Sequence, residues 1–521
     1  MSKIITAAQA AALVKDGCTL TTTGFNGFGC PEDLIMSLAE HYDQTGHPRD
    51  VTLVKCTSQG DGKGRGVSHL AAKEGLFKEL ILTHMGYDPG LRKLVQEEKV
   101  TCYMLPLGNM MQLFRAIAGG LPGAIATTGI GTFADPRNGG GKANQKTLHS
   151  GKNVVSLLEL GGQECLFYPS FPIDICFIRA TYGDEAGNLS IREEAMNVEQ
   201  FEVAAAVHNS GGIVIAQVDK VVRRGTIPAK EVLIHGFMVD YIVEGRPEYS
   251  KQSFETDLFR PEIAGLAVTP SAGFDPLAMG PRKICCRRAA MELPQDAIVN
   301  LGTGAPEKIA NVAAEEGISD KLILTVEAGG IAGVPYGGTQ FGASANAMAI
   351  LDHNVQFDFY QGGGLDVAFL GLAETAPNGD LNVSKFGTRL AGAGGFIDIT
   401  QNAKKVVYCG TFTAKGLKTE CKDGKLIITQ EGAKKKFVKQ VEHITFSGVY
   451  ANKVHQPVLY VTERAVFELR PEGVTLIEIA PGIDLQTQVL DQMEFMPKIA
   501  EDLKLMDERI FRDELMGLAN D

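Results

Sequence analysis

Short apolar runs alternate with longer stretches of helical pattern along the chain. Runs such as Val51–Val54 and Leu322–Val326 have the length and composition of buried strands. The stretches between them have apolar residues at helical spacing, and glycine clusters often stand where a strand ends. This alternation predicts an α/β protein with open, mostly parallel sheets covered by helices.

The same plan occurs twice in the sequence. Residues 3–24 read KIITAAQAAALVKDGCTLTTTG, and residues 283–304 read KICCRRAAMELPQDAIVNLGTG, an offset of 280 without a gap. Each segment has a helical stretch, a loop, an apolar strand and a glycine turn, followed by a helix that Pro opens. A second match joins IDICFIRATYGDEAGNLSI, from Ile173, to LDVAFLGLAETAPNGDLNV, from Leu365, at an offset of 192. We therefore expect two related α/β domains that arose from an internal repeat.

The boundary between the two domains falls in a segment rich in Pro, Gly and Ala. We interpret residues 253–281 as a linker, which leaves an N-terminal domain of residues 1–252 and a C-terminal domain of residues 282–521. The length of 521 residues agrees with this division, because it exceeds what one hydrophobic core supports.

Charge and composition exclude several classes of protein. The net charge of −12 and the lack of a basic stripe argue against a nucleic-acid partner. No run of 18 apolar residues and no signal peptide is found, which indicates a cytoplasmic protein without a membrane span. The ten Cys form no CxxC pair, so we expect reduced thiols and no metal site.

Glu327 is the first candidate for chemistry because it follows the apolar run Leu322–Val326. In open α/β sheets, ligands bind beyond the carboxyl ends of the strands. The small residues after it, AGGIAG, allow a substrate to approach closely, and a carboxylate can act as the nucleophile in acyl transfer. The alternative is a charged residue at a strand end that pairs with a nearby Lys or Arg, and position alone leaves both open.

Two glycine turns could present backbone N–H groups to an anion. The turn Gly302–Gly304 stands between a strand and a helix, where a helix N-terminus favours negative charge. The run Gly392–Gly395 could stabilise a developing oxyanion. Ordinary tight turns are the alternative reading for both, and Gly302–Gly304 lacks the full dinucleotide-binding fingerprint.

His353 stands beside Asp352 and nine residues after Ser344, which invites comparison with a hydrolase triad. However, Ser344 is not part of a G-x-S-x-G elbow. We therefore interpret His353 as a packed or hydrogen-bonded residue.

Taken together, these motifs resemble the family I CoA-transferases, and most closely their single-chain acetate and propionate CoA-transferases. The matching segments are NLGTGAPEKIA, LTVEAGGIAGVPYGG, FDFYQGGGLDVAFLGLAE and NVSKFGTRLAGAGGFIDI, between Asn300 and Ile399. In the first half, GFNGFGCPEDLI, from Gly24 to Ile35, resembles the glycine-rich turn of the family. The motifs occur in the family's order and span nearly the whole chain.

The resemblance implies a role for each of these segments. The N-terminal domain would be the α-subunit-like half, and the C-terminal domain would be the β-subunit-like half with the catalytic glutamate. That glutamate maps onto Glu327, which would form a glutamyl-CoA thioester in a ping-pong reaction, while the repeat puts Cys56 at the equivalent place. The expected oxyanion donors are the backbone N–H groups of Thr303 and Gly394. The residues expected to contact coenzyme A or the substrate are Gly302, Gly304, Gly392, Gly395, Gly27 and Gln59.

The resemblance also implies the partners of the protein. These are an acyl-CoA and a free short-chain acid (acetate, propionate, butyrate or lactate), with no metal and no cofactor beyond the substrate coenzyme A. Ala328 stands where many relatives have Ser or Asn, which leaves the acid preference open. A homodimer or homotetramer is expected.

Two other functions are weighed against this one. An acyl-CoA hydrolase would use the same Glu327 and admit water. A non-catalytic sensor of a CoA ester or a sugar phosphate is a second alternative, since one fold supports many functions. A regulator would be expected to have a basic DNA-binding module, and none is visible in this acidic sequence.

Overall fold

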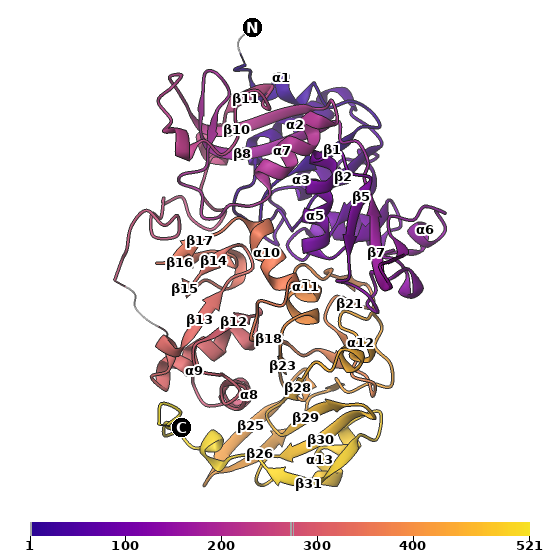
Figure 1. Ribbon diagram of the computed structural model, residues 1–521, viewed down its shortest axis with the longest axis vertical. Coiled ribbons are helices and arrows are strands. Elements are labelled where there is room, and N and C mark those ends of the chain that lie inside the picture. The colour runs from indigo at the N-terminus through magenta and orange to yellow at the C-terminus, as the bar shows by residue number, and fades with distance from the viewer. Residues whose placement is uncertain (1–2, 271–273, 275, 521) are drawn as a thin grey trace.

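The protein consists of two α/β units that follow one another along its long axis. The computed structural model describes residues 3–270, 274 and 276–520. Figure 1 shows the N-terminal unit, coloured indigo to magenta, above the C-terminal unit, coloured rose through orange to yellow. Each unit is built round one large sheet, which confirms the predicted fold class.

The first sheet has the strand order β11-β10-β8-β1-β2-β3-β4, and neighbours along this order run parallel. Strand β2 (Val51–Val54) is buried along its whole length, as expected where helices cover both faces of a sheet. The other strands are β1 (Thr19–Thr22), β3 (Phe77–Leu82), β4 (Thr101–Met104), β8 (Ile175–Asp184), β10 (Ile213–Val222) and β11 (Tyr241–Glu244), with the antiparallel β9 (Leu189–Ser190) beside β8. The helices of this half are α1 (Ala7–Ala11), α2 (Glu32–Thr45), α3 (Ser68–Ala71), α4 (Pro89–Gln96), α5 (Leu107–Ala118), α6 (Gln145–Leu148) and α7 (Gln200–Asn209).

The second sheet has the order β17-β14-β13-β12-β18-β23-β28-β29-β30-β31. Its centre, β13-β12-β18-β23-β28, is parallel, and antiparallel pairs extend it on both sides. The central strands are β12 (Ala297–Leu301), β13 (Leu322–Thr325), β18 (Val367–Gly371), β23 (Val406–Cys409) and β28 (Val458–Val461), and the outer ones are β14 (Gly330–Ile331), β17 (Ala349–Ile350), β29 (Ala465–Arg470), β30 (Gly473–Ile479) and β31 (Lys498–Leu505). The helices are α8 (Pro281–Ala290), α9 (Ile309–Glu315), α10 (His353–Gln361), α11 (Phe396–Gln401), α12 (Gly448–Lys453) and α13 (Leu485–Gln488).

The internal repeat is visible in both sheets. Strand β1 lies between β8 and β2, and its counterpart β12 lies between β18 and β13. Strands β8 and β18 begin at Ile175 and Val367, which keeps the offset of 192 found in the sequence. The first half has extra elements before β8, including a small antiparallel sheet of β5 (Gly123–Ala126), β7 (Gln163–Pro169) and β6 (Ser156–Leu160). Those elements account for the different offsets of the two sequence matches.

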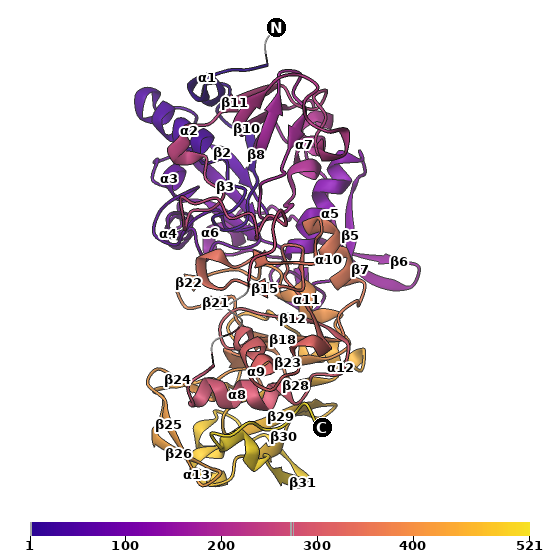
Figure 2. The same cartoon turned by 90° about the vertical axis from the view of Figure 1, so that its left-hand side faces the viewer.

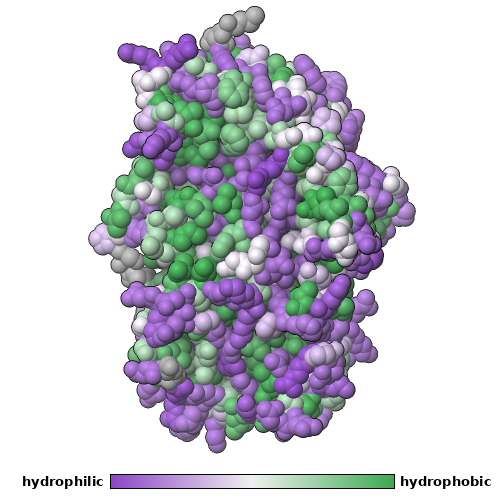
Figure 3. All heavy atoms as spheres, viewed as in Figure 1, coloured by the Kyte–Doolittle hydropathy of each residue, from purple (hydrophilic) through white to green (hydrophobic). Residues whose placement is uncertain are grey.

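The segment between the two sheets runs along one side of the molecule. Part of the proposed linker, residues 271–273 and 275, lies outside the described residues. Asn346 donates its backbone N–H to the carbonyl of Glu262 at 3.2 Å, so this segment rests on the second half. Figure 3 shows apolar side chains gathered at mid-height on that side. In the segment itself Leu258 and Val268 are exposed, and so is Met348, two residues after Asn346. No helix in the described ranges is both long and apolar enough to cross a bilayer.

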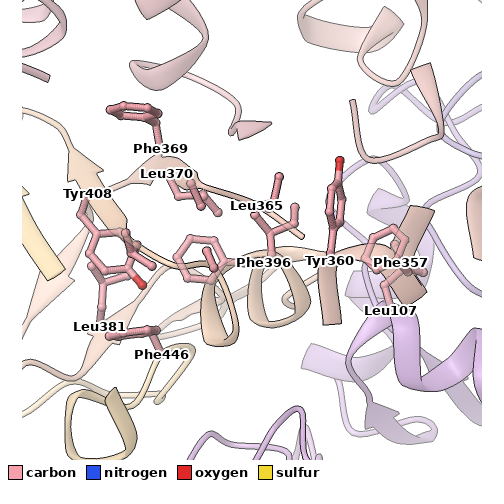
Figure 4. Packing of buried hydrophobic residues seen from close by; sticks show 14 of the residues in the cluster. Leu107, Phe357, Tyr360, Leu365, Phe369, Leu370, Leu381, Phe396, Tyr408 and Phe446 are labelled. Carbon is pink, nitrogen blue, oxygen red and sulfur yellow. The ribbon is translucent and has the colours of Figure 1, made fainter. Parts of the chain in front are cut away.

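Three helices join the halves. Helix α5 of the first unit packs against α10 of the second, and α10 packs against α11 (Figure 2). Figure 4 shows Leu107 of α5 beside Phe357 and Tyr360 of α10, and the apolar cluster continues to Phe396 of α11. One core therefore runs through the junction of the halves.

Side-chain amide groups add directional contacts to this junction. Gln361 of α10 donates to Oδ1 of Asn109 at 2.8 Å and to Oδ1 of Asp398 at 2.7 Å. Gln401 of α11 accepts the backbone N–H of Gly129 at 2.7 Å and donates to the carbonyl of Thr127 at 2.9 Å. Because these bonds are directional, they fix the position of α10 and α11 relative to the first half.

We expect Gln401→Met to lower the free energy of unfolding by about 1–3 kcal/mol, because it leaves the buried N–H of Gly129 without a partner. Gln430→Met is the matched control, since the exposed Gln430 also donates to a carbonyl, that of Gly416, at 2.7 Å. Its effect should stay below about 0.5 kcal/mol. Urea unfolding measures both variants, and equal midpoints would contradict the role given to Gln401.

Candidate active site

A cavity of about 530 Å³ lies between the two halves. The first half contributes Phe25, Asn26, Thr57, His84, Gly86 and Tyr87 to its wall. The second half contributes Gly302, Thr303, Glu327 and the run Gly392–Gly395, among others. Neither unit forms this cavity alone.

The position of the cavity follows from the direction of the strands. Thr57 and His84 come shortly after β2 and β3 in the first sheet, while Gly302 and Glu327 come shortly after β12 and β13 in the second. The carboxyl ends of both parallel sheets therefore open onto the same space, as expected for ligand sites in this class of fold.

Glu327 stands in a turn just beyond β13. The turn is held by the N–H of Gly329, which donates to the carbonyl of Val326 at 2.9 Å. The side chain is partly exposed to the cavity, and burial raises its pKa to about 8, with the carboxyl of Asp398 adding to the effect. Within the described part of the chain no Lys or Arg pairs with Glu327, so the ion-pair alternative is not seen.

Asp398 is a second buried carboxyl near Glu327. It lies on α11, it is fully buried, and its Oδ1 accepts the hydrogen bond from Gln361 at 2.7 Å. Burial raises its pKa to about 7, although Gln361 and backbone N–H groups of α5 donate to it. Sequence reasoning missed this residue, because nothing in the sequence shows that α11 packs behind the cavity.

Gly395 lies beside the carboxylate of Glu327. A Cβ atom at this position would lie 2.7 Å from Oε2 of Glu327 and equally close to Cζ of Phe357. The backbone at Gly395 is ordinary, with φ −81° and ψ −1°, so any residue could adopt it. The lack of a side chain at Gly395 is therefore what makes room for the carboxylate.

The two expected oxyanion donors differ in their availability. The N–H of Thr303 bonds to no described backbone oxygen and lies in the turn that lines the cavity. The N–H of Gly394 is already used, because it donates to the carbonyl of Thr83 at 3.2 Å. The next N–H in the run, that of Gly395, has no described backbone acceptor. The expectation for Gly394 therefore passes to Gly395.

Gly302 and Gly392 line the cavity as expected, but three other candidate contact residues do not. Gly304 has φ +88°, is exposed and is not part of the cavity wall. A Cβ at Gly27 would meet the side chain of Phe254 at 2.9 Å. Gln59 is fully buried, and its Nε2 donates to the carbonyl of Thr22 at 2.7 Å. Gly27 and Gln59 pack inside the first half and do not point into the cavity.

His353 is buried, as its interpretation from the sequence required. Its ring packs edge-on against Phe25 and Phe357, with centroids 5.4 and 5.2 Å away. The hydroxyl of Ser344 donates to the carbonyl of Ala332 at 2.9 Å and not to His353. The two residues therefore do not form a hydrolase pair.

Cys56, the repeat counterpart of Glu327, is not in the cavity wall. Its thiol is fully buried in the apolar cluster, and burial holds its pKa well above the ordinary value. The repeat thus places an ionisable group at the cavity in one half and an inert thiol in the other.

The sequence is similar to known proteins along its whole length. Residues 4–245 match the family model described as Coenzyme A transferase. The chain is 44% identical over 523 residues to a caffeate CoA-transferase of Acetobacterium woodii, which covers 99% of both chains. It is 43% identical over 516 residues to the acetate CoA-transferase YdiF of Escherichia coli O157:H7, which covers 99% of this chain and 96% of that protein.

A solved structure extends the similarity to the fold. The crystal structure of an acyl-CoA transferase (YdiF) of E. coli O157:H7, described as a thioester complex with CoA, superposes with a TM-score of 0.91. The two chains are 42% identical, and the match covers 99% of this chain and 97% of that one.

We expect Glu327→Gln to stabilise the protein more at high pH than at low pH. The folded state keeps a proton on Glu327 up to a pH of about 8, whereas the unfolded chain releases it near pH 4.5, so stability falls as the pH rises through this window. Glutamine mimics the protonated form and removes this loss. The melting temperature of the variant should exceed that of the original protein by several degrees at about pH 9 and by little at about pH 5.

Glu307→Gln provides the matched control for this comparison. Glu307 lies in the short turn of helix beside Gly302–Gly304 and keeps contact with solvent in the folded state. Its replacement should change the melting temperature less at both pH values. A Glu327→Gln difference that is the same at both pH values would contradict the raised pKa.

Proposed function

Because the chain belongs to the coenzyme A transferase family, we propose that it moves coenzyme A between a short-chain acyl-CoA and a free short-chain carboxylic acid. One observation supports this most: an unpaired carboxylate, Glu327, faces a cavity that both halves enclose, with a glycine packed against it. The thioester with CoA in the YdiF structure agrees with a covalent intermediate of this kind.

The proposed reaction has a ping-pong course. The carboxylate of Glu327 attacks the thioester carbonyl of the acyl-CoA, the C–S bond breaks, and coenzyme A leaves as a thiolate. The thiolate then attacks the glutamyl carbonyl of the resulting anhydride, which releases the first acid and leaves a glutamyl-CoA thioester. The second acid runs the same steps in reverse, so that no water and no redox partner is consumed.

The protein groups around Glu327 fit the needs of these steps. Each addition creates an oxyanion, and the N–H groups of Thr303 and Gly395 are the donors that we assign to it. Removing one such donor costs about 3 kcal/mol in comparable sites. Burial weakens the hydration of the carboxylate, which makes it a stronger nucleophile once it is ionised. Since the pKa of Glu327 is about 8, turnover should rise with pH up to that value.

Acetate, propionate, butyrate and lactate are the acids that we propose, and acetate is the acid in the name of YdiF. The aromatic acid in the name of the A. woodii relative is a second candidate. The aromatic rings of Phe25, Phe341 and Tyr87 in the cavity wall favour it, because a planar acid can stack between such rings. A direct comparison of acetate and caffeate as acceptors separates the two.

Other properties of the enzyme are proposed from the same family relationship. We propose a homodimer or homotetramer in the cytoplasm, without nucleic-acid or membrane partners and with no cofactor besides the substrate coenzyme A. The ten free cysteines agree with a reducing compartment. An acyl-CoA hydrolase would act through the same Glu327, and it differs by releasing coenzyme A without any acceptor acid.

We expect acetyl-CoA alone to load coenzyme A onto Glu327. Borohydride reduces a glutamyl thioester to the alcohol, so the mass change should appear on the peptide that contains Glu327. Glu327→Gln should abolish this label, whereas Glu307→Gln, a carboxyl beside the same cavity turn, should keep it. An unlabelled Glu327 in a protein that binds acetyl-CoA would count against the covalent mechanism and favour a hydrolase or a sensor.

We expect Gly395→Ala to lower kcat/KM by about 100-fold. The new methyl group would lie 2.7 Å from Oε2 of Glu327, which is too close, so it displaces the carboxylate. Gly119→Ala is a control of the same chemistry. Gly119 has φ −81° and ψ 0°, and its Cβ would approach no heavy atom closer than 3.4 Å. Steady-state rates of both variants decide the matter, and equal activities would contradict the contact.

A further inference from the structure

We propose that His84 is a substrate-binding residue, whose Nε2–H donates a hydrogen bond to the carboxylate of the acid that accepts coenzyme A. This inference rests on the proposed function and adds a residue of the first half to a site so far described mainly from the second.

The backbone of His84 is fixed to the glycine run of the second half. The N–H of Met85 donates to the carbonyl of Ala391 at 2.8 Å, and the N–H of Gly394 donates to the carbonyl of Thr83 at 3.2 Å. A Cβ at Gly392 would lie 2.3 Å from that same carbonyl oxygen, so the two segments touch along their backbones. His84 is therefore held against the loop whose next residue, Gly395, contacts Glu327.

The hydrogen bonds of the ring determine which nitrogen has the proton. Nδ1 of His84 lies 3.3 Å from the backbone N of Gly86, whose N–H can only donate. Nδ1 also lies 2.9 Å from Oγ of Ser58, and that oxygen accepts the N–H of Tyr87 at 3.2 Å. The hydroxyl hydrogen of Ser58 is thus free to point to Nδ1. With Nδ1 accepting twice, the proton of the neutral ring lies on Nε2.

Burial and the nearby cations keep the ring of His84 neutral. Burial, together with the cations Lys55 and Arg92, lowers the pKa of His84 to about 4. Lys55 donates to the carbonyl of His84 at 3.2 Å and pairs with the buried Asp88 at 2.8 Å, while Glu327 lines the same cavity. At the pH where Glu327 is active, His84 is therefore a hydrogen-bond donor and not a base.

The Nε2–H group of His84 can bind a substrate oxygen that the N–H groups of Thr303 and Gly395 do not bind. In the described part of the chain no protein atom accepts this hydrogen, and the ring is part of the cavity wall. Thr303 and Gly395 are assigned to the oxyanion that forms at the attacked carbonyl. An incoming carboxylate has a second oxygen, which does not attack, and a neutral donor from the opposite half can hold that oxygen in place.

The test is the effect of removing and restoring this donor. His84→Met has a similar length and no donor, whereas His84→Gln can place an amide N–H near the position of Nε2. We expect His84→Met to raise the KM for acetate by about 10- to 100-fold, the value of one hydrogen bond to a charged group. The KM for acyl-CoA should change less than about threefold, and His84→Gln should recover much of the acetate affinity. Equal losses in both variants, or an unchanged KM for acetate, would overturn the proposal.

Two further measurements separate this inference from the proposed function. Borohydride trapping should still find the thioester on Glu327 in His84→Met. If the mass change on Glu327 is also missing in the original protein, the covalent mechanism itself is contradicted, and not only the role of His84. If His84→Met fails to fold, the ¹⁵N chemical shifts of the original protein, labelled at histidine, report the tautomer of His84. The signal that disappears in His84→Gln identifies this residue. A proton on Nδ1, or an Nε2 signal that saturating acetate does not move, would also overturn the proposal.

Discussion

The structure depends on keeping one carboxylate both poorly hydrated and unpaired. A buried charge without a partner destabilises a folded protein by several kcal/mol, and for this reason Glu327 keeps its proton up to a pH of about 8. Neighbouring residues leave it space and do not neutralise it: Gly395 has no side chain to displace it, and Asp398 adds negative charge. The two sheets share a continuous core, and side-chain amides form hydrogen bonds between the halves. These contacts supply the folding free energy that offsets the cost of burying Glu327.

The junction of the halves is consequently part of the chemistry as well as of the fold. Gln361 donates hydrogen bonds both to Asn109 in the first half and to Asp398 in the second. Asp398, which adds to the effect of burial on the pKa of Glu327, is therefore positioned by contacts across the junction. Residues 392–394 likewise pair with residues 83–85 of the first half. A small relative shift of the two units would change the surroundings of Glu327 before it broke the core.

Several features of the site could be predicted from sequence because they follow from the direction of parallel strands. Glu327 and Gly302 were found by the rule that ligands meet the carboxyl ends of strands, and β8 and β18 keep the offset of the repeat. The same rule applied to Phe77–Leu82 would have found His84. Gly27 and Gln59 lie outside the cavity wall, because glycine content and strand position do not show which side of a loop faces the cavity.

Elements that depend on long-range pairing were harder to predict. Lys498–Leu505 is rich in charged residues, yet it forms strand β31 because it pairs with β30. Asp398 and the free N–H of Gly395 are visible only once α11 is placed against the cavity.

The cavity between two halves of one chain also has a consequence for assembly. The segment 253–281 joins the two halves that form the walls of the site. A short tether gives each half an effective concentration of about millimolar near the other, and this value does not depend on the amount of protein in the cell. Two separate subunits would lose complete sites on dilution and would need matched synthesis. Here a single translation product always contains one nucleophile and one opposing wall, and dilution cannot separate them.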